Sequence, residues 1–194
     1  RVELQQRGGH RLHGVGVRRA TELLISLGHR RIALVTGPRE LFPGRDRLDG
    51  YKAALAAAGL PFDSSLVVGT SFHACFLEVS GIISHRTRPT AIILGGTSML
   101  PDAMTAIRSA NLQIPHDISV IASTDTDLAR LATPPISVVE WDSDAVGRCC
   151  AQVLLRRLTE NPADAQKICF APELIVRASH GPVQVATPEN LASE

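Results

Sequence analysis

A junction between two kinds of segment, at residues 20–35, limits what this chain can fold into. An amphipathic stretch, Ala20 to Leu27, ends at Gly28, and the apolar run Ile32 to Val35 begins four residues later. Glycine tolerates the left-handed conformation that closes a helix, and the intervening basic residues suit the negative end of a helix dipole. The junction therefore predicts a helix that leads directly into a buried strand.

The same alternation continues along the chain. Short apolar segments separated by helical patterns and by glycine or proline turns are typical of an α/β fold, with a parallel sheet and helices on both faces. Helices are expected at 15–27, 45–58 (closed by Gly59), 72–85, 98–110, 128–131 and 142–159. Strands are expected at 31–36, 66–68, 90–94, 118–122, 136–139, 167–170 and 173–177, and a loose tail at 181–194.

Composition excludes several classes of function. The net charge of +1 over 194 residues gives no overall field toward nucleic acid or a membrane. The four cysteines form no Cys-x-x-Cys pair, which favours free thiols and a reducing cytoplasm. No apolar run is long enough for a bilayer, and no signal-peptide pattern follows the basic start. The chain does not begin with methionine, which suggests a fragment of a longer protein.

Motifs for catalysis or metal binding are weak. The segment Gly95-Gly96-Thr97-Ser98 is either a tight turn with a capping hydroxyl or a helix start that binds phosphate. It matches neither the Walker loop nor the Gly-x-Gly-x-x-Gly motif of nucleotide-binding proteins. No Gly-x-Ser-x-Gly elbow occurs, and the close pair His10 and His13 lies among arginines, which disfavours a metal cation. We therefore expect neither an enzyme, nor a cofactor, nor a metal.

In a parallel sheet a ligand sits at the carboxyl ends of the strands, so the loops after those strands carry the candidate residues. Arg45 and Arg47 flank Asp46 near a helix start, where cations match the dipole poorly. Such an arginine is either exposed and paired with a neighbouring aspartate, or directed into a cleft as a bidentate donor. Trp141 and Phe72 are either core residues or stacking walls for a ligand.

A series of phrases then occurs in order and with regular spacing. They are Gly28-His29-Arg30-Arg31-Ile32-Ala33, Arg47-Leu48-Asp49-Gly50-Tyr51, Arg88-Pro89-Thr90-Ala91-Ile92, Ile114-Pro115-His116-Asp117-Ile118-Ser119-Val120-Ile121, Thr133-Pro134-Pro135-Ile136-Ser137 and Leu174-Ile175-Val176-Arg177-Ala178-Ser179. From about Val15 to Ser179 the chain resembles the carboxy-terminal part of a LacI/GalR-family transcriptional regulator.

The resemblance implies a Rossmann-like lobe of the type I periplasmic-binding-protein kind, with an incomplete first lobe. Residues 1–14 would be a remnant or linker and 15–180 the effector-binding and dimerisation domain. Within it, 31–131 and 167–179 would form the second lobe, and 136–160 would cross toward the first. The apolar face of the 142–159 helix is then expected to be exposed or covered by another copy.

The implied function is a ligand-responsive DNA-binding regulator, a repressor, acting as a homodimer in the cytoplasm. Its effector would be a sugar, a sugar phosphate or another small polar metabolite. Operator DNA would be bound through an amino-terminal helix-turn-helix that this segment lacks. The alternative is a stand-alone periplasmic-type solute-binding protein.

The resemblance also implies site residues. They are Arg47, Phe72, Thr97, Thr124, Asp125 and Trp141. Arg47 matches the arginine that holds the effector, whereas Thr97 and Thr124 stand where the family usually has aspartates, and Trp141 where it often has glutamine. Losing two acceptor carboxylates while keeping an arginine makes the cleft less negative. We therefore expect an anionic or less hydroxylated effector, or a cleft that has lost its ligand and serves dimerisation alone.

Overall fold

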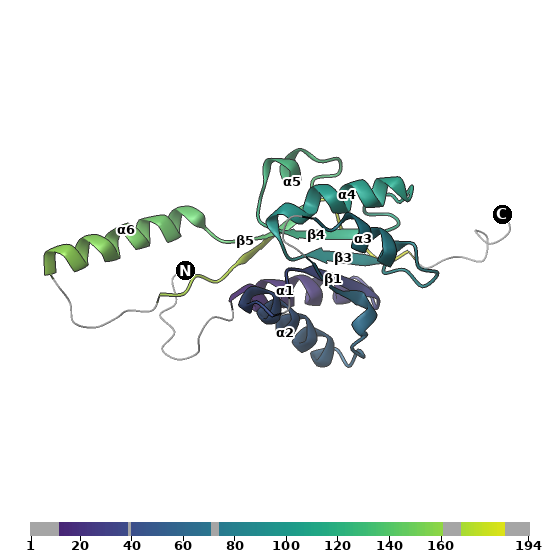
Figure 1. Cartoon of the computed structure of the whole chain (residues 1–194), viewed down its shortest axis with the longest axis horizontal. Coiled ribbons are helices and arrows are strands. Elements are labelled where there is room, and N and C mark those ends of the chain that lie inside the picture. The colour runs from purple at the N-terminus through teal and green to yellow at the C-terminus, as the bar shows by residue number, and fades with distance from the viewer. Residues whose placement is uncertain (1–11, 39, 71–73, 161–167, 185–194) are drawn as a thin grey trace.

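The computed structural model describes residues 12–38, 40–70, 74–160 and 168–184 (Figure 1). Its centre is a six-stranded sheet in the order β2-β1-β3-β4-β5-β6, parallel except for β6, which pairs antiparallel with β5. The strands are β1 (Ile32–Thr36), β2 (Val67–Gly69), β3 (Ala91–Leu94), β4 (Ser119–Ser123), β5 (Ser137–Glu140) and β6 (Glu173–Ile175). The helices are α1 (Leu12–Ser26), α2 (Phe42–Ala57), α3 (Phe76–Ile83), α4 (Leu100–Ser109), α5 (Asp127–Leu131) and α6 (Ser143–Glu160), with short 3₁₀ turns η1 (Ser64–Leu66) and η2 (Thr97–Met99).

Alternate residues of the strands supply two separate hydrophobic cores. In β1, Ile32 and Leu34 pack with α1 and α2, whereas Ala33 and Val35 pack on the opposite face with α3 and α4. This follows from the period of two in a strand, which sends successive side chains to opposite faces. Figure 1 shows α1 and α2 on one side of the sheet and α3, α4 and α5 on the other. Helices thus cover both faces, as the sequence predicts.

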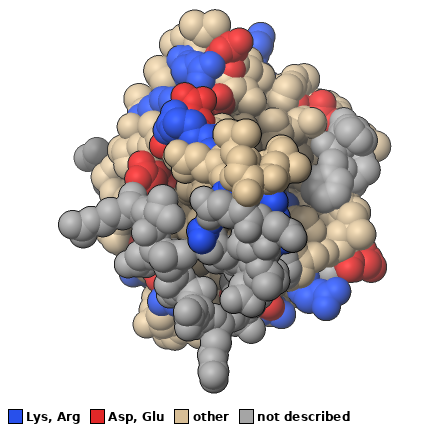
Figure 2. All heavy atoms as spheres, turned by 90° about the vertical axis from the view of Figure 1, so that its left-hand side faces the viewer, with Lys and Arg blue, Asp and Glu red and all other residues tan. Residues whose placement is uncertain are grey.

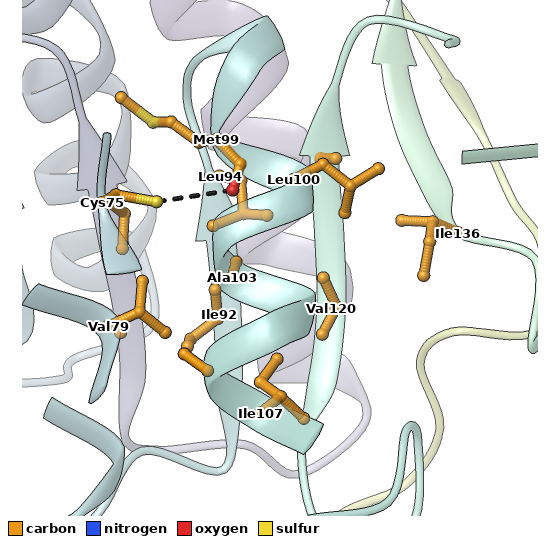
Figure 3. Close-up of a cluster of buried hydrophobic side chains, with 14 of the residues drawn as sticks. Cys75, Val79, Ile92, Leu94, Met99, Leu100, Ala103, Ile107, Val120 and Ile136 are labelled. Atoms are coloured by element: carbon orange, nitrogen blue, oxygen red, sulfur yellow. Dashed lines mark hydrogen bonds between the residues drawn. The ribbon is translucent and has the colours of Figure 1, made fainter. Parts of the chain in front are cut away.

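Buried side chains from α4 and from the strands beneath it pack together in one core (Figure 3). Cys75 is fully buried, and its Sγ lies 3.4 Å from the Met99 carbonyl oxygen. Burial raises the pKa of this thiol to about 11, so it is protonated and behaves as a small hydrophobic residue.

The helix ends predicted at glycine are confirmed. Gly28 has a φ of +92°, its N–H donates to Ile25, and the N–H of His29 donates to Leu24, which satisfies two carbonyls of the last turn of α1. Gly59, with a φ of +67°, closes α2 by the same pair of bonds. In both cases glycine adopts a conformation that other residues rarely reach.

Most element boundaries agree with the sequence prediction to within a helical turn, but the predicted 72–85 helix is shorter. Residues 72 and 73 lie outside the described residues, and α3 begins only at Phe76. The backbone before it is bonded elsewhere, because the Cys75 N–H donates to Asp102 and the Ala74 carbonyl accepts from Thr70. These bonds compete with an earlier helical turn.

Two further predictions were wrong over their described parts, 168–170 and 181–184. The described part of the expected 167–170 strand contains only a single bridge at Cys169, and Pro172, which has no N–H to donate, follows closely. The expected loose tail begins with ordered contacts, since the Val183 N–H donates to Leu27 at 3.0 Å and His29 Nε2 lies 2.9 Å from the Gly181 carbonyl oxygen. Residues 185–194 lie outside the described ranges.

Helix α6 stands clear of the sheet (Figure 1). Asp142 caps its start by accepting from the Ala145 N–H at 2.7 Å. Leu154, Leu155 and Leu158 are 59%, 61% and 75% exposed. The expectation of an uncovered apolar face is confirmed for Cys150 and Leu154, whereas Val146 and Val153 are half-buried.

Candidate functional site

Four parallel strands, β1, β3, β4 and β5, end at one edge of the sheet. The loops that leave this edge begin at Gly37, Gly95, Thr124 and Trp141. Ligands of open α/β sheets bind outside such an edge, where loops rather than ladder bonds present the polar groups. The site residues that the sequence predicts are therefore expected along this edge.

Arg47 projects from α2 over the ends of β1 and β3. A Cβ atom added at Gly95 would lie 2.8 Å from Arg47 Cδ and 3.2 Å from Thr36 Oγ1, so the arginine runs directly across this glycine beside Thr36. Arg47 is only 8% exposed. Arg45, two residues earlier, is exposed and donates to the Glu40 carbonyl. Of the two alternatives for this arginine pair, the structure has Arg47 directed to the edge and Arg45 directed to solvent.

Three buried polar atoms at this edge have no hydrogen-bond partner among the described residues. They are Arg47 Nη1, Thr36 Oγ1 and His13 Nδ1, and a fourth such atom, Asp125 Oδ1, belongs to the loop after β4. Buried polar groups in folded proteins are almost always paired, because an unpaired one costs about 1–3 kcal/mol. Three of them at the ligand edge of the sheet indicate a site whose hydrogen bonds are completed by another molecule or segment.

The crossing of α1 and α2 holds His13 and Arg47 in this position. The Gly14 N–H donates to the buried Asp46 Oδ2 at 2.8 Å, so a carboxylate sits at the positive start of α1. A Cβ atom on Gly50 would lie 2.0 Å from the Gly14 carbonyl oxygen, so only glycine allows the two backbones to approach this closely. Asp46 therefore has a structural role, whereas Arg47, the next residue, faces the edge.

Thr97 and Thr124 come together as the resemblance implies. Their hydroxyl oxygens are 3.1 Å apart, one following β3 and the other β4. Thr124 has a φ of +75°, an unusual conformation for a β-branched residue, and its N–H donates to the Val139 carbonyl. The pair leaves hydroxyl donors and acceptors where the family usually has two carboxylates.

Trp141 packs edge-on against His13. Their ring centroids are 5.1 Å apart at an interplanar angle of 74°. The tryptophan is half-buried, and its backbone N–H donates to the Glu140 carboxylate. Its ring therefore forms one wall next to the unpaired histidine. Phe72, the other predicted aromatic, lies outside the described residues.

Asp125 was expected to bind the ligand, but its carboxylate is paired with arginines of this chain. Its Oδ2 accepts from Arg177 at 2.7 Å and pairs with Arg130 at 3.2 Å, and its backbone N–H donates to the Glu140 carboxylate. The hydrogen bond from Arg177 is the main cause that lowers the pKa of Asp125. Asp125 thus ties the loop after β4 to the segment after β6, while its Oδ1 is buried without a partner.

Electrostatics at the edge favour binding over proton transfer. Burial is the main cause that lowers the pKa of His13, and the nearby positive charge of Arg47 adds to it, so the imidazole is neutral near pH 7. Burial also lowers the pKa of Arg47, which nevertheless stays protonated. Within the described ranges, no three His, Cys, Asp or Glu side chains are placed to hold a metal.

Sequence reasoning missed His13 and Thr36. Thr36 is the last residue of an otherwise apolar strand, Ile32 to Thr36, and that change from apolar to polar at the ligand edge was a usable sign. His13 was considered only as a metal ligand with His10. Its contact with Trp141 depends on how α1 meets the loop after β5, which local sequence does not reveal.

Two cavities lie away from this edge. One of about 290 Å³ lies between β2 and α3, lined by Val68, Glu78 and His85 among others. A second of about 100 Å³ lies at the opposite end of the sheet, beside His29 and Arg88. Figure 2 views the side on which α6 lies, where the visible acidic and basic side chains are interspersed rather than gathered in one patch. None of the helices in the described ranges combines the length and apolar character needed to span a bilayer.

The chain matches known proteins along most of its length. Residues 21–180 match the periplasmic binding protein-like domain. The ribose operon repressor of Escherichia coli is 38% identical over 162 residues, covering 82% of this chain and 49% of that protein. A LacI-family regulatory protein from Chloroflexus aggregans superimposes with a TM-score of 0.79 at 32% identity, over 88% of this chain and 62% of that one.

The lac repressor dimer bound to operator and an anti-inducer is a third neighbour. Its TM-score is 0.76 at 26% identity, over 87% of this chain and 59% of that chain. The chain spans about half the length of the curated relatives it matches. By its matching domain, its fold and these relatives, the chain belongs to the periplasmic-binding-protein-like domain family, as the effector-domain part found in LacI-family transcriptional regulators.

Proposed function

We propose that this chain is the effector-binding and dimerisation part of a ligand-responsive DNA-binding regulator, a repressor acting in the cytoplasm. The observation that carries the proposal is the set of three buried, unpartnered polar atoms of His13, Thr36 and Arg47 at the ligand edge of the sheet. The similarity to the ribose operon repressor and to the lac repressor dimer supports it. No chemistry on the ligand is proposed.

The effector in this proposal is a small polar metabolite such as a sugar or a sugar derivative. Arg47 donates to it from α2, and the hydroxyls of Thr97 and Thr124 exchange hydrogen bonds with it from the loops after β3 and β4. Trp141 packs against its apolar face. Asp125 contributes by holding the loop after β4 in place through its ion pair with Arg177.

The mechanism is a shift in population between lobe arrangements. We assign 31–131 and 167–179 to one lobe and 136–160 to the connection toward another, with 15–180 as the whole domain. The exposed leucines of α6 support a surface that a further lobe or a second copy covers. A ligand that binds one arrangement more tightly favours it, and operator DNA, bound through a helix-turn-helix segment, responds to the change.

The dimer contact of this proposal is the outer face of the α3, α4 and α5 layer. Leu77 on α3 is 78% exposed and Leu131 at the end of α5 is 82% exposed, with Phe76 and Leu128 also exposed beside them. Several large apolar side chains on one helical layer are typical of a protein interface. Sedimentation equilibrium tests this contact. Leu131→Arg is expected to weaken a homodimer that uses this face, whereas Leu41→Arg, at an exposed leucine just before α2, serves as the matched control.

Ligand binding is tested through the single tryptophan of the chain. Trp141 lies at the site, so its fluorescence reports occupancy directly. Titration with pentoses, hexoses and their phosphorylated and oxidised forms is expected to change the emission saturably, and Arg47→Gln is expected to weaken that change. A flat response to the whole panel would count against an effector site at this edge.

The similarity to transcriptional repressors favours the regulator over the alternative expected from the sequence, a stand-alone solute-binding protein of the same fold. It would bind ligand at the same edge as a monomer, without influence on DNA. Two measurements separate the two functions. One is sedimentation of the chain, and the other is binding of operator DNA by the whole regulator. Each is made with and without the ligand that Trp141 detects.

A further inference from the structure

We propose that the cavity between β2 and α3 is a second binding site, which takes a small uncharged molecule with an apolar body and one acceptor group. The cavity has a volume of about 290 Å³. Arg31, Ser65 and Thr87, which line part of it, precede β1, β2 and β3 along the chain. The cavity therefore reaches toward the amino ends of the strands, away from the effector site, and the proposal stands independently of that site.

Gly81 lines this cavity from inside α3, and no contact explains why it is glycine. A glycine within a helix lowers the stability of the helix relative to alanine. A Cβ atom added at Gly81 would meet no atom of the described residues within 4 Å, so no neighbour requires its absence. The backbone there is helical, a conformation that alanine adopts readily. The space left by the missing side chain therefore points to a molecule that occupies it.

The positions on α3 that line the cavity share one face of the helix. They are Glu78, Gly81 and Ile82, with His85 just past the helix end. Residues three and four apart are neighbours on a helix surface. A side chain larger than hydrogen at position 81 would therefore stand on the face that lines the cavity, and would reduce the space for a ligand.

Apolar side chains form the walls of the cavity. Leu66 is buried, and Val68 and Ile82 are half-buried and pack against the core. Ligand sites in proteins are lined mainly by such groups, and their removal from water drives binding. A cavity of ~150 Å³ with apolar walls holds one benzene ring, so the volume here gives room for about two fused rings.

The charged groups at the cavity are engaged or solvated. Arg31 donates to the Thr87 carbonyl oxygen at 2.8 Å and pairs with Asp63 at 3.3 Å. Glu78 accepts from the Thr70 hydroxyl at 2.8 Å and is exposed to solvent. Since the positive charge has a partner on this chain and the negative charge is screened by water, neither requires an opposite charge on the ligand.

His85 supplies the polar contact of the proposed site. Its Nδ1 accepts from the Thr87 N–H at 3.2 Å, which places the proton of the neutral ring on Nε2. Within the described ranges, Nε2 has no hydrogen-bond partner. An N–H donor beside apolar walls suits one acceptor oxygen on the ligand, such as a carbonyl.

Titration of the chain with coumarin, a neutral lactone of two fused rings, tests the site by two-dimensional ¹H–¹⁵N NMR. We expect saturable shifts of the amide signals of Val68, Gly81 and Ile82, with a Kd below about 1 mM. The amide signals of Arg47 and Trp141 at the effector site are expected to stay unchanged. Coumarin-3-carboxylate and 3-(aminomethyl)coumarin, which add a negative and a positive charge, are expected to bind no more tightly than coumarin.

Variants assign binding to the cavity. Gly81→Leu is expected to abolish the coumarin shifts while its urea midpoint rises by about 0.4 M, because leucine favours the helix. Gly147→Leu makes the same change in α6, where an added Cβ atom also meets no described atom within 4 Å, and is expected to leave coumarin binding intact. His85→Ala is expected to weaken coumarin binding by about threefold or more.

Each outcome decides a part of the proposal. Coumarin binding that survives Gly81→Leu, or the absence of shifts up to about 5 mM coumarin, would overturn the second site. If Gly81→Leu does not fold, Gly81→Ala takes its place and must weaken binding relative to Gly147→Ala. Binding of either charged form about tenfold more tightly than coumarin would overturn the uncharged ligand and leave the cavity as its site.

Discussion

The hydrogen bond from Gly14 to Asp46 joins the two helices that carry His13 and Arg47, and its removal tests how the site is held. The carboxylate is 4% exposed and accepts the buried Gly14 N–H at 2.8 Å, at the start of α1. Asp46→Ala removes a charge-assisted bond worth about 1.5–3 kcal/mol and leaves a buried N–H without a partner. We expect the free energy of unfolding to fall by about 2 kcal/mol.

Urea unfolding followed by circular dichroism measures this loss. With a slope of about 2 kcal/mol per molar urea, the midpoint is expected to move down by about 1 M. Asp46→Asn, which keeps an acceptor oxygen but not the charge, is expected to lose less than half as much. Asp49→Ala removes an exposed aspartate of the same helix and serves as the control.

The functional consequence is read from the same samples. Because Gly14 follows His13 directly, loosening the start of α1 is expected to disturb the edge contact between His13 and Trp141 and so change the tryptophan emission. If the urea midpoint of Asp46→Ala equals that of Asp49→Ala, the bond does not organise this site and the reasoning about α1 and α2 is wrong.

Three further predictions follow from other contacts. Burial lowers the pKa of His29 and His180, so the unfolded chain binds more protons than the folded chain below about pH 6.5. The free energy of unfolding is therefore expected to fall as the pH drops from 7 to 5.5. Urea midpoints at both pH values test this, and a constant midpoint would contradict it. Thr124→Asn should raise the free energy of unfolding by about 1 kcal/mol, because asparagine tolerates the φ of +75° better; a loss of stability would argue against strain there. Leu158→Glu on the exposed face of α6 should change stability by less than about 0.5 kcal/mol, whereas Ile93→Ala in the sheet should cost about 2–5 kcal/mol, as comparative melts would show.

Much of the fold was predictable because its determinants are local. Gly28 and Gly59 close helices with a backbone conformation that is intrinsic to glycine, and the apolar runs at β1, β3 and β4 are buried on both faces. The strand predicted at 167–170 and the looseness predicted for 181–184 were wrong for the opposite reason. Whether such segments pair depends on distant partners, such as Leu27 for Val183.

The site was predicted in part. Reasoning from the residues left Arg47 open between solvent and cleft, because an arginine on a helix looks the same in either case. The choice depended on Gly95, whose missing side chain leaves room for Arg47 to cross the strand ends. Thr97 and Thr124 were predicted from the resemblance alone, and only the parallel order of β3 and β4 brings their hydroxyls to 3.1 Å.

The sequence by itself determined the α/β alternation, the helix ends and the family, because these depend on periodicity, glycine and the order of short phrases along the chain. Tertiary structure alone decided which polar groups meet at the ligand edge. It brought His13 from α1, Thr36 from β1 and Arg47 from α2 to the same buried place, and it gave Asp46, Asp125 and Glu140 partners elsewhere. The physical reason is that hydrogen bonding and burial depend on distances in space, which residues far apart in the chain acquire only when the sheet and its helices pack together.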